Sequence, residues 1–168
     1  DATPIDLAAV AAGSGGFVIN GQCASDYSGI SVSSAGDVNG DGLADLIVGA
    51  NLSDPATRSN AGRSYVVFGK TGTTAIELSA LGSGGFVING QGASDYSGIS
   101  VSSAGDVNGD GLADLIVGAW ASDAATRSDA GRSYVIFGAT NGAMANTAVD
   151  WLGTTGDDAK TSTGSQTL

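Results

Sequence analysis

The sequence lacks histidine altogether and has a single cysteine among its 168 residues. Without histidine there is no Ser-His-Asp or Cys-His nucleophile system, no HExxH zinc site and no imidazole to shuttle protons. One cysteine forms neither an internal disulfide nor a cysteine-rich zinc site. These absences exclude the commonest nucleophilic and zinc-dependent enzyme classes, and they leave aspartate as the main source of chemistry.

Positive charge is also scarce, because six Lys and Arg residues stand against 17 Asp and Glu, for a formal net charge of −11. A chain this acidic is repelled by nucleic-acid backbones and by anionic membrane surfaces. No apolar run in the sequence approaches the roughly 18 residues that a membrane-spanning helix needs. We therefore expect neither nucleic-acid binding nor membrane insertion.

Large side chains are few, since aromatic residues make up 6% of the chain while glycine occurs 28 times. Such a composition predicts a thin core in which backbones pack closely, as in tight β-sheet packing. The charged fraction is only 14% and valine and isoleucine are frequent, which argues against a disordered chain. The chain is therefore expected to fold around β-structure.

An internal repeat with an offset of 69 residues dominates the sequence. Segments 13–69 and 82–138 are identical at 51 of 57 positions, and AGDVNGDGLADLIVGA occurs in both. Repeats of this length indicate a propeller blade or a solenoid turn. The six differing pairs are Cys23/Gly92, Asn51/Trp120, Leu52/Ala121, Pro55/Ala124, Asn60/Asp129 and Val67/Ile136.

The repeat sets the domain organisation that we expect. Upstream of it, IDLAAV from Ile5 mirrors IELSAL from Ile76 with a length difference of two residues. The predicted parts are an N-terminal lead-in over 1–12, a first repeat over 13–81, a second repeat over 82–138 and a Gly/Thr-rich C-terminal tail over 139–168.

Each repeat is expected to form four short strands separated by turns rich in Gly, Ser and Asp. No window of 11 or more residues has a helical period, and the alanine-rich stretch 8–12 is too short to stand as a helix. The fold class is therefore all-β, with two four-stranded propeller-type blades. In the second repeat the predicted strands are Phe86–Asn89, Ile99–Ala104, Ala113–Ala119 and Arg132–Phe137.

Two such sheets bury one interface and leave two outer faces open, whereas propellers close with about four to eight blades. The sequence therefore predicts an incomplete propeller that is closed or extended in one of two ways. Either neighbouring blades of a longer chain complete it, or several copies self-associate into a ring or filament.

An aspartate-rich loop of the form D-x-N-x-D-G-x-x-D lies between two apolar strands in each repeat. The carboxylate and amide oxygens of its Asp and Asn side chains can surround one hard cation. The glycine permits a sharp turn, and the backbone carbonyl at the seventh position adds another oxygen ligand. An all-oxygen set with three carboxylates suits Ca²⁺ better than zinc, copper or Mg²⁺. The predicted ligands of two structural Ca²⁺ ions are Asp37, Asn39, Asp41, Leu43 (carbonyl) and Asp45, and Asp106, Asn108, Asp110, Leu112 (carbonyl) and Asp114.

An EF-hand and an ordinary solvated turn are the other interpretations of these loops. An EF-hand needs an acid at the twelfth position, where Val48 and Val117 stand, and its flanks are helices, so it is excluded. An ordinary solvated turn explains a single Asp/Asn/Gly run. The nine-residue pattern is complete and occurs twice, which favours metal binding. Outside the loops, Asp26 and Asp95 are expected to be exposed loop residues rather than paired catalytic acids.

The run FVINGQGASDYSGISVSSAGDVNGDGLADLIVGA, followed by GRSYVIFG, resembles the FG-GAP repeat of integrin α-subunit propellers and of secreted bacterial relatives. The resemblance covers about 5–138. It implies that the metal loop joins the first two strands of a blade and that its ligands are the ten residues above. It also implies that Phe17–Asn20 and Phe86–Asn89 are outer strands of the preceding blade.

These inferences converge on a non-enzymatic, calcium-binding propeller module of a secreted or cell-surface protein, with a structural or adhesive role and self-association. The alternative is a carbohydrate- or protein-binding propeller segment of a large extracellular hydrolase or lectin. For the tail, we expect either a flexible linker or a segment, Thr147–Leu152, that supplies the missing outer strand.

Overall fold

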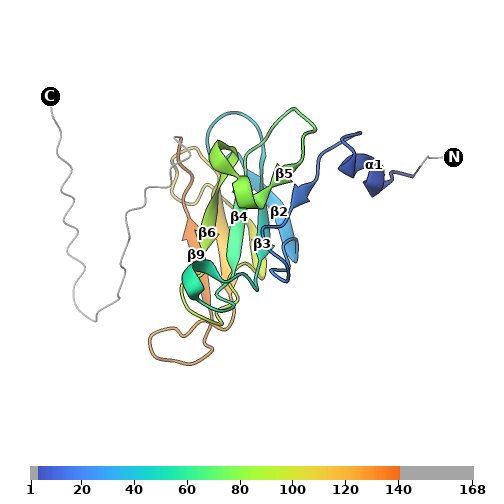
Figure 1. Ribbon diagram of the computed structural model, residues 1–168. Coiled ribbons are helices and arrows are strands. Elements are labelled where there is room, and N and C mark those ends of the chain that lie inside the picture. The colour runs from blue at the N-terminus through green and yellow to red at the C-terminus, as the bar shows by residue number, and fades with distance from the viewer. Residues whose placement is uncertain (1–3, 141–168) are drawn as a thin grey trace.

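The computed structural model describes residues 4–140, so the expectations for the tail, Thr147–Leu152 included, lie outside the described residues. Two antiparallel sheets form the body of the protein (Figure 1). The first, called blade one here, has the strand order β2-β3-β4-β6. Its strands are β2 (Ser31–Gly36), β3 (Asp45–Ala50), β4 (Arg63–Val67) and β6 (Gly85–Asn89).

Blade two is built in the same way from the second repeat but has three strands, in the order β7-β8-β9, within the described residues. The fold is therefore all-β with two propeller-type blades, as the sequence predicted. The strands of blade two are β7 (Ser100–Gly105), β8 (Asp114–Ala119) and β9 (Arg132–Ile136).

The boundary between the sheets does not coincide with the boundary between the repeats. Strand β6 belongs to the second repeat but pairs with β4 of the first, with Arg63 opposite Asn89 and Val67 opposite Gly85. This confirms the expectation that the GFVIN segment is the outer strand of the preceding blade. Within the described residues, the equivalent segment of the first repeat, 16–20, pairs with neither blade.

That segment forms β1 (Ile19–Asn20), which pairs in parallel with β5 (Ile76–Glu77). The N–H of Ile76 donates to the carbonyl of Val18 at 2.9 Å, and Asn20 Nδ2 donates to Glu77 Oε1 at 2.6 Å. The sequence did not predict this pair, because two-residue strands leave no alternation to detect.

The lead-in contains a helix, α1 (Leu7–Ala11), where the sequence predicted none. Asp6 caps it by accepting a hydrogen bond from the N–H of Ala8 at 2.9 Å, which offsets the cost of so short a helix. None of its residues is buried. Within residues 4–140, no helix is long and apolar enough to cross a membrane. Three short 3₁₀ turns cover Pro55–Thr57, Leu78–Ala80 and Gly82–Gly84.

The main core lies between the two blades. Blade one contributes Ala35, Ile47 and Val66, and blade two contributes Leu115 and Val117, all of them inaccessible to solvent. Because a single sheet cannot bury apolar side chains alone, each blade depends on the other for this face.

A second core covers the opposite face of blade one. Here Ala50, Tyr65 and Val67 pack against Leu78, which lies in the segment between β4 and β6, and Ile19 packs against this cluster. The segment before β6 therefore covers one face of the sheet to which β6 belongs.

The blades approach so closely that glycine is required at their contact. A Cβ placed on Gly49, in the middle of β3, would lie 1.9 Å from the carbonyl oxygen of Gly98 in blade two. Gly49 does not have a positive φ, so its backbone conformation alone does not call for glycine. The lack of a side chain is instead required by the neighbouring backbone.

We expect Gly49→Ala to destabilise the protein by about 1–3 kcal/mol or more, because the added methyl group forces the blades apart. The change is measured as the free energy of unfolding in urea. Gly72→Ala is the matched control, since its Cβ meets nothing within 4 Å and its φ is not positive. Equal stabilities of the two variants would contradict the close contact.

Candidate metal centre

The two aspartate loops occupy equivalent places, the first between β2 and β3 and the second between β7 and β8. In each hairpin the strand register shifts just before the loop, at Ser34/Gly36 and at Ser103/Gly105. The shift ends the ladder and directs the following aspartate into the turn. Blade geometry therefore places both loops alike.

Asp37 organises the first loop by accepting hydrogen bonds from three backbone N–H groups. Its Oδ1 accepts from Gly40 at 2.7 Å and Asp41 at 3.1 Å, and its Oδ2 accepts from Gly42 at 2.9 Å. Both glycines have positive φ, 76° and 87°, which is the reason that glycine is needed there. The result is a tight turn wrapped around one carboxylate.

The middle of the loop is held by its other polar side chains. Asn39 Oδ1 accepts from the N–H of Asp41 at 2.9 Å, and Asp41 Oδ1 accepts from Leu43 at 2.8 Å. Asn39 Nδ2 also donates to Asp41 Oδ2 at 3.1 Å. The first three predicted ligands are thus brought together in one turn.

The second loop repeats this arrangement. Asp106 Oδ1 accepts from Gly109 at 2.7 Å and Asp110 at 3.1 Å, and its Oδ2 accepts from Gly111 at 2.9 Å. Asn108 Oδ1 accepts from Asp110 at 2.9 Å. Two loops in different surroundings therefore adopt one geometry, which indicates that the loop sequence itself determines it.

Asp45, the last predicted side-chain ligand of the first loop, has a different role from the others. It is fully buried, and its oxygens accept from the N–H groups of Val38 at 2.9 Å and Gly69 at 2.7 Å. Asp114 does the same with Val107 at 2.8 Å and Gly138 at 2.9 Å. Each aspartate ties its loop to the strand end beside it.

The electrostatics of Asp45 reflect this position. Burial, the largest effect, raises the pKa of its carboxyl above the ordinary value. Hydrogen bonds from Gly69 and Val38 lower the pKa, and the negative charges of Asp41 and Asp37 raise it again. The ionised form of Asp45 is therefore destabilised in the protein as described, and a nearby cation would favour it.

The donor chemistry fits a hard cation. The hydrogen bonds that the six loop carboxylates accept come from backbone N–H groups and from the loop asparagines. Six negative charges are thus gathered at two loops with neutral donors around them, and oxygen is the atom that Ca²⁺ prefers.

The predicted ligands do not all converge in the described residues. No three acidic side chains are close enough together within residues 4–140 to hold an ion. Asp37 and Asp41 share the turn, whereas Asp45 is engaged with backbone N–H groups. The full ligand sets, Leu43 and Leu112 included, therefore stay a prediction.

The sequence was wrong about the aspartates outside the loops. Asp26 and Asp95 are buried rather than exposed, and they accept hydrogen bonds from Ser53 Oγ at 2.7 Å and Ser122 Oγ at 3.1 Å. Each bond spans 27 residues. The Asp–Ser spacing of 27 residues, which is the same in both repeats, was the available signal. The sequence analysis missed it because both aspartates were assigned to loops.

We expect Asp45→Asn to lower the free energy of unfolding by about 1–3 kcal/mol in the presence of a chelator, because an amide nitrogen cannot accept from a backbone N–H. Urea denaturation measures the change. Asp41→Asn, in the exposed turn, keeps its Oδ1 acceptor and serves as the control. A loss of equal size in both variants would contradict the anchoring role.

Comparison with known proteins supports the repeat assignment. The FG-GAP repeat family matches residues 28–67 and 97–136. Each match contains the first three strands of a blade together with its aspartate loop. The two matched segments are related by the same offset of 69 residues as the repeats.

Two curated proteins are similar to the chain. Integrin alpha-3 of Cricetulus griseus is 34% identical over 102 residues, which are 61% of this chain and 9% of that protein. Integrin alpha pat-2 of Caenorhabditis briggsae is 38% identical over 100 residues, which are 56% of this chain and 7% of that protein. The chain therefore spans less than a tenth of the length of these relatives.

Proposed function

Since the chain carries two FG-GAP repeats, we propose that it is a calcium-binding propeller module with a structural role in a secreted or cell-surface adhesion protein. The observation that carries the proposal is the pair of aspartate loops with one hydrogen-bonding geometry. In both, a single carboxylate orders the turn and a buried carboxylate closes it. The role is non-enzymatic.

Calcium is the ion that the loops suit best. Asp37, Asn39 and Asp41 supply oxygens from one turn, and Asp45 is the further carboxylate whose ionised form a cation would favour. A bound ion supplies charge neutralisation. Affinities of about 10⁻⁴–10⁻³ M are typical of extracellular modules, so a modest affinity suits a protein of the cell surface.

A structural role follows from what the first loop touches. Its backbone carbonyls at Asp37 and Val38 accept hydrogen bonds from blade two, from Ala113 at 3.1 Å and Ala139 at 2.9 Å. Ordering this loop therefore also orders the contact between the blades. A ligand that binds only the folded loop stabilises the whole fold by mass action.

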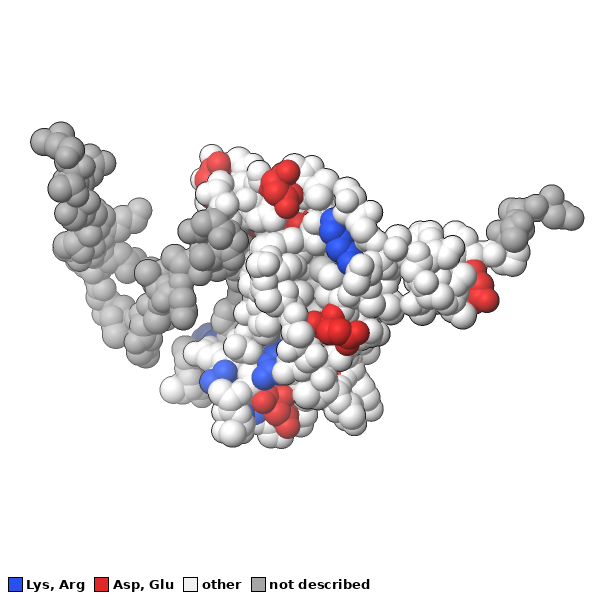
Figure 2. All heavy atoms as spheres, turned by 45° about the horizontal axis from the view of Figure 1, so that its top comes forward, with Lys and Arg blue, Asp and Glu red and all other residues white. Residues whose placement is uncertain are grey.

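An adhesive setting is supported by the similarity to two integrin alpha proteins. The net charge of −11 favours a protein over a nucleic acid as the partner. On the face that Figure 2 shows, acidic side chains stand in separate groups and the few basic ones are scattered among them. Long-range attraction to phosphate backbones needs a basic stripe, which this face does not present.

We expect Ca²⁺ at about 100 times its dissociation constant to add about 2.7 kcal/mol per site, which raises the melting temperature by roughly 5 °C or more. Mg²⁺ at the same concentration should have a smaller effect, because it demands a tighter octahedral site. Differential scanning calorimetry measures the shift, and isothermal titration should give two ions per chain.

The double variant Asp41→Asn with Asp110→Asn should abolish the calcium shift and leave the melting temperature in chelator nearly unchanged. Asp54→Asn with Asp123→Asn is the matched control, because it removes the same charge from equivalent loop positions outside the aspartate loops. The proposal fails if the unaltered protein has the same melting temperature in calcium as in chelator.

A further inference from the structure

The two blades are almost identical in sequence but not in surroundings. On the side of blade two that faces blade one, Val101 is 7% exposed, whereas its equivalent in blade one, Val32, is 67% exposed. On the opposite kind of face, Val66 of blade one is fully buried, whereas its equivalent Val135 is 49% exposed. On the face of blade one that corresponds to the docking face of blade two, the part around β2 is therefore open, beside the part that the second core covers. Blade two in turn has an open face of the kind that receives a docking blade.

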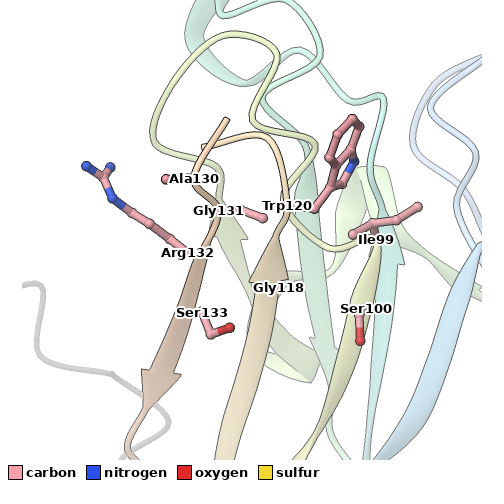
Figure 3. Close-up of a pocket in the computed structure, with 9 residues that line it drawn as sticks. Ile99, Ser100, Gly118, Trp120, Ala130, Gly131, Arg132 and Ser133 are labelled. Carbon is pink, nitrogen blue, oxygen red and sulfur yellow. The ribbon is translucent and has the colours of Figure 1, made fainter. Parts of the chain in front are cut away.

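The receiving face is occupied in blade one by the turn before β7. There Gly98 approaches Gly49, and the N–H of Ser97 donates to the carbonyl of Ala61 at 3.0 Å. The equivalent place in blade two is a hollow of about 460 Å³, which we call the socket (Figure 3). The equivalents of Gly49 and Gly62, namely Gly118 and Gly131, line it.

Among residues 4–140 of a single copy, nothing requires glycine at position 118. Gly118 lies inside β8 without a positive φ, and the nearest atom to an added Cβ is the Cβ of Ser100 at 3.5 Å, an ordinary contact. Glycine in a strand interior weakens the strand and often marks the close approach of another backbone. In blade one that backbone is Gly98, and at the socket it is absent from the described residues.

A segment that fits the socket is present in the first repeat. Ser28 and Gly29 are equivalent to Ser97 and Gly98, and an added Cβ on Gly29 would meet nothing within 4 Å. Trp120 stands at the rim of the socket (Figure 3) and is largely exposed, whereas its equivalent Asn51 is buried. Docking of a second 28–29 segment would cover this indole as well.

Strand pairing gives the same answer. The outer edge of β9 is unpaired within residues 4–140, whereas the equivalent edge of β4 pairs with β6. When each residue of the β4–β6 register is replaced by its equivalent in the other repeat, Asn20 lies opposite Arg132 and Gly16 opposite Ile136. The strand that β9 lacks is thus segment 16–20.

The existing bond between β1 and β5 does not block this pairing. At the two ends of β6, the carbonyl of Gly84 and the N–H of Gly90 face the β4 side. Residues 84, 86, 88 and 90 therefore face β4, and their equivalents in the first repeat are residues 15, 17, 19 and 21. In β1, the carbonyl of Val18 accepts from β5, and Val18 belongs to the other set of alternate residues. The edge of segment 16–20 that would meet β9 is therefore free within the described part of the chain.

The lead-in provides a third match. Leu78 is 3% exposed in the second core, whereas the equivalent Leu7 is 77% exposed. Blade two has an apolar hollow of about 160 Å³ that Ile88, Tyr134 and Ile136 line. These residues are equivalent to Ile19, Tyr65 and Val67, the surroundings of Leu78, so the hollow is where a second Leu7 belongs.

We infer that a second copy of this chain docks head to tail on blade two, with its segment 16–20 added to β9, its residues 28–29 in the socket and its Leu7 in the apolar hollow. The chain's own N-terminal elements do not reach these places, because they lie on one side of the molecule and β9 on the other (Figure 1). Such a heterologous contact generates rings or filaments. This interaction goes beyond calcium binding and uses none of the aspartate side chains.

Sedimentation velocity of the 168-residue chain in millimolar calcium tests the inference. We expect the mass to rise with concentration in whole multiples of 16.2 kDa. Gly118→Ala should weaken association at least about tenfold, because the methyl group occupies the place of the partner's backbone. Gly72→Ala is the matched control and should associate like the unaltered chain.

Val32→Asp tests the opposite end, since it puts a carboxylate on the docking face at a residue that is exposed in the single copy. Each variant alone should be monomeric at concentrations where the unaltered chain assembles. A mixture of the two has one intact contact and should form a 1:1 dimer and nothing larger. An equimolar mixture that stays monomeric would overturn the head-to-tail arrangement, and so would assembly that neither substitution weakens.

Hydrogen exchange distinguishes a second copy from other occupants of β9. The amides of Ser133 and Val135, on the outer edge, should become protected as the chain associates and should exchange freely in the Gly118→Ala monomer. Protection in that monomer would mean that the chain's own Thr147–Leu152 covers the edge, and the inference would be wrong. A chain that remains monomeric at about 1 mM would also overturn it.

Discussion

The fold depends on the close contact between neighbouring blades, where backbone meets backbone. Because aromatic side chains are few, large side chains cannot fill the core. The sheets must therefore lie close enough together for small residues to exclude water. Gly49 permits this by having no side chain where the carbonyl of Gly98 stands. The abundance of glycine is thus a packing requirement as well as a turn requirement.

Charge is organised at the ends of the central strands. Asp45 and Asp114 are buried at the ends of central strands, where each holds two backbone N–H groups that would otherwise lack partners. Burying a carboxylate is costly unless it is hydrogen-bonded. The N–H groups offset this cost, and the clustered charge of the adjacent turns opposes it. For Asp45 burial has the largest effect, so the pKa of its carboxyl stays above the ordinary value.

The sequence predicted most of the strands because apolar residues alternate with Ser in β2 and β7 and form continuous runs in the central strands. It also predicted that Phe86–Asn89 joins the preceding blade, through the family resemblance. It missed α1, whose stability depends on one cap at Asp6, and the β1–β5 pair, whose strands are two residues long. Asp26 and Asp95 were misplaced because burial depends on a serine 27 residues away.

Near-identity of the two repeats separates local from long-range constraints. The loop geometry is the same in both copies, so the loop residues alone account for it. Val32 is 67% exposed and Val101 is 7% exposed, although their hairpins are alike. The burial of these valines therefore depends on the neighbouring blade and not on their own hairpin. Gly118 belongs to this second class, since its own blade leaves room for a side chain. The glycine at position 118 is therefore best explained by a contact like the one that its equivalent, Gly49, makes with Gly98.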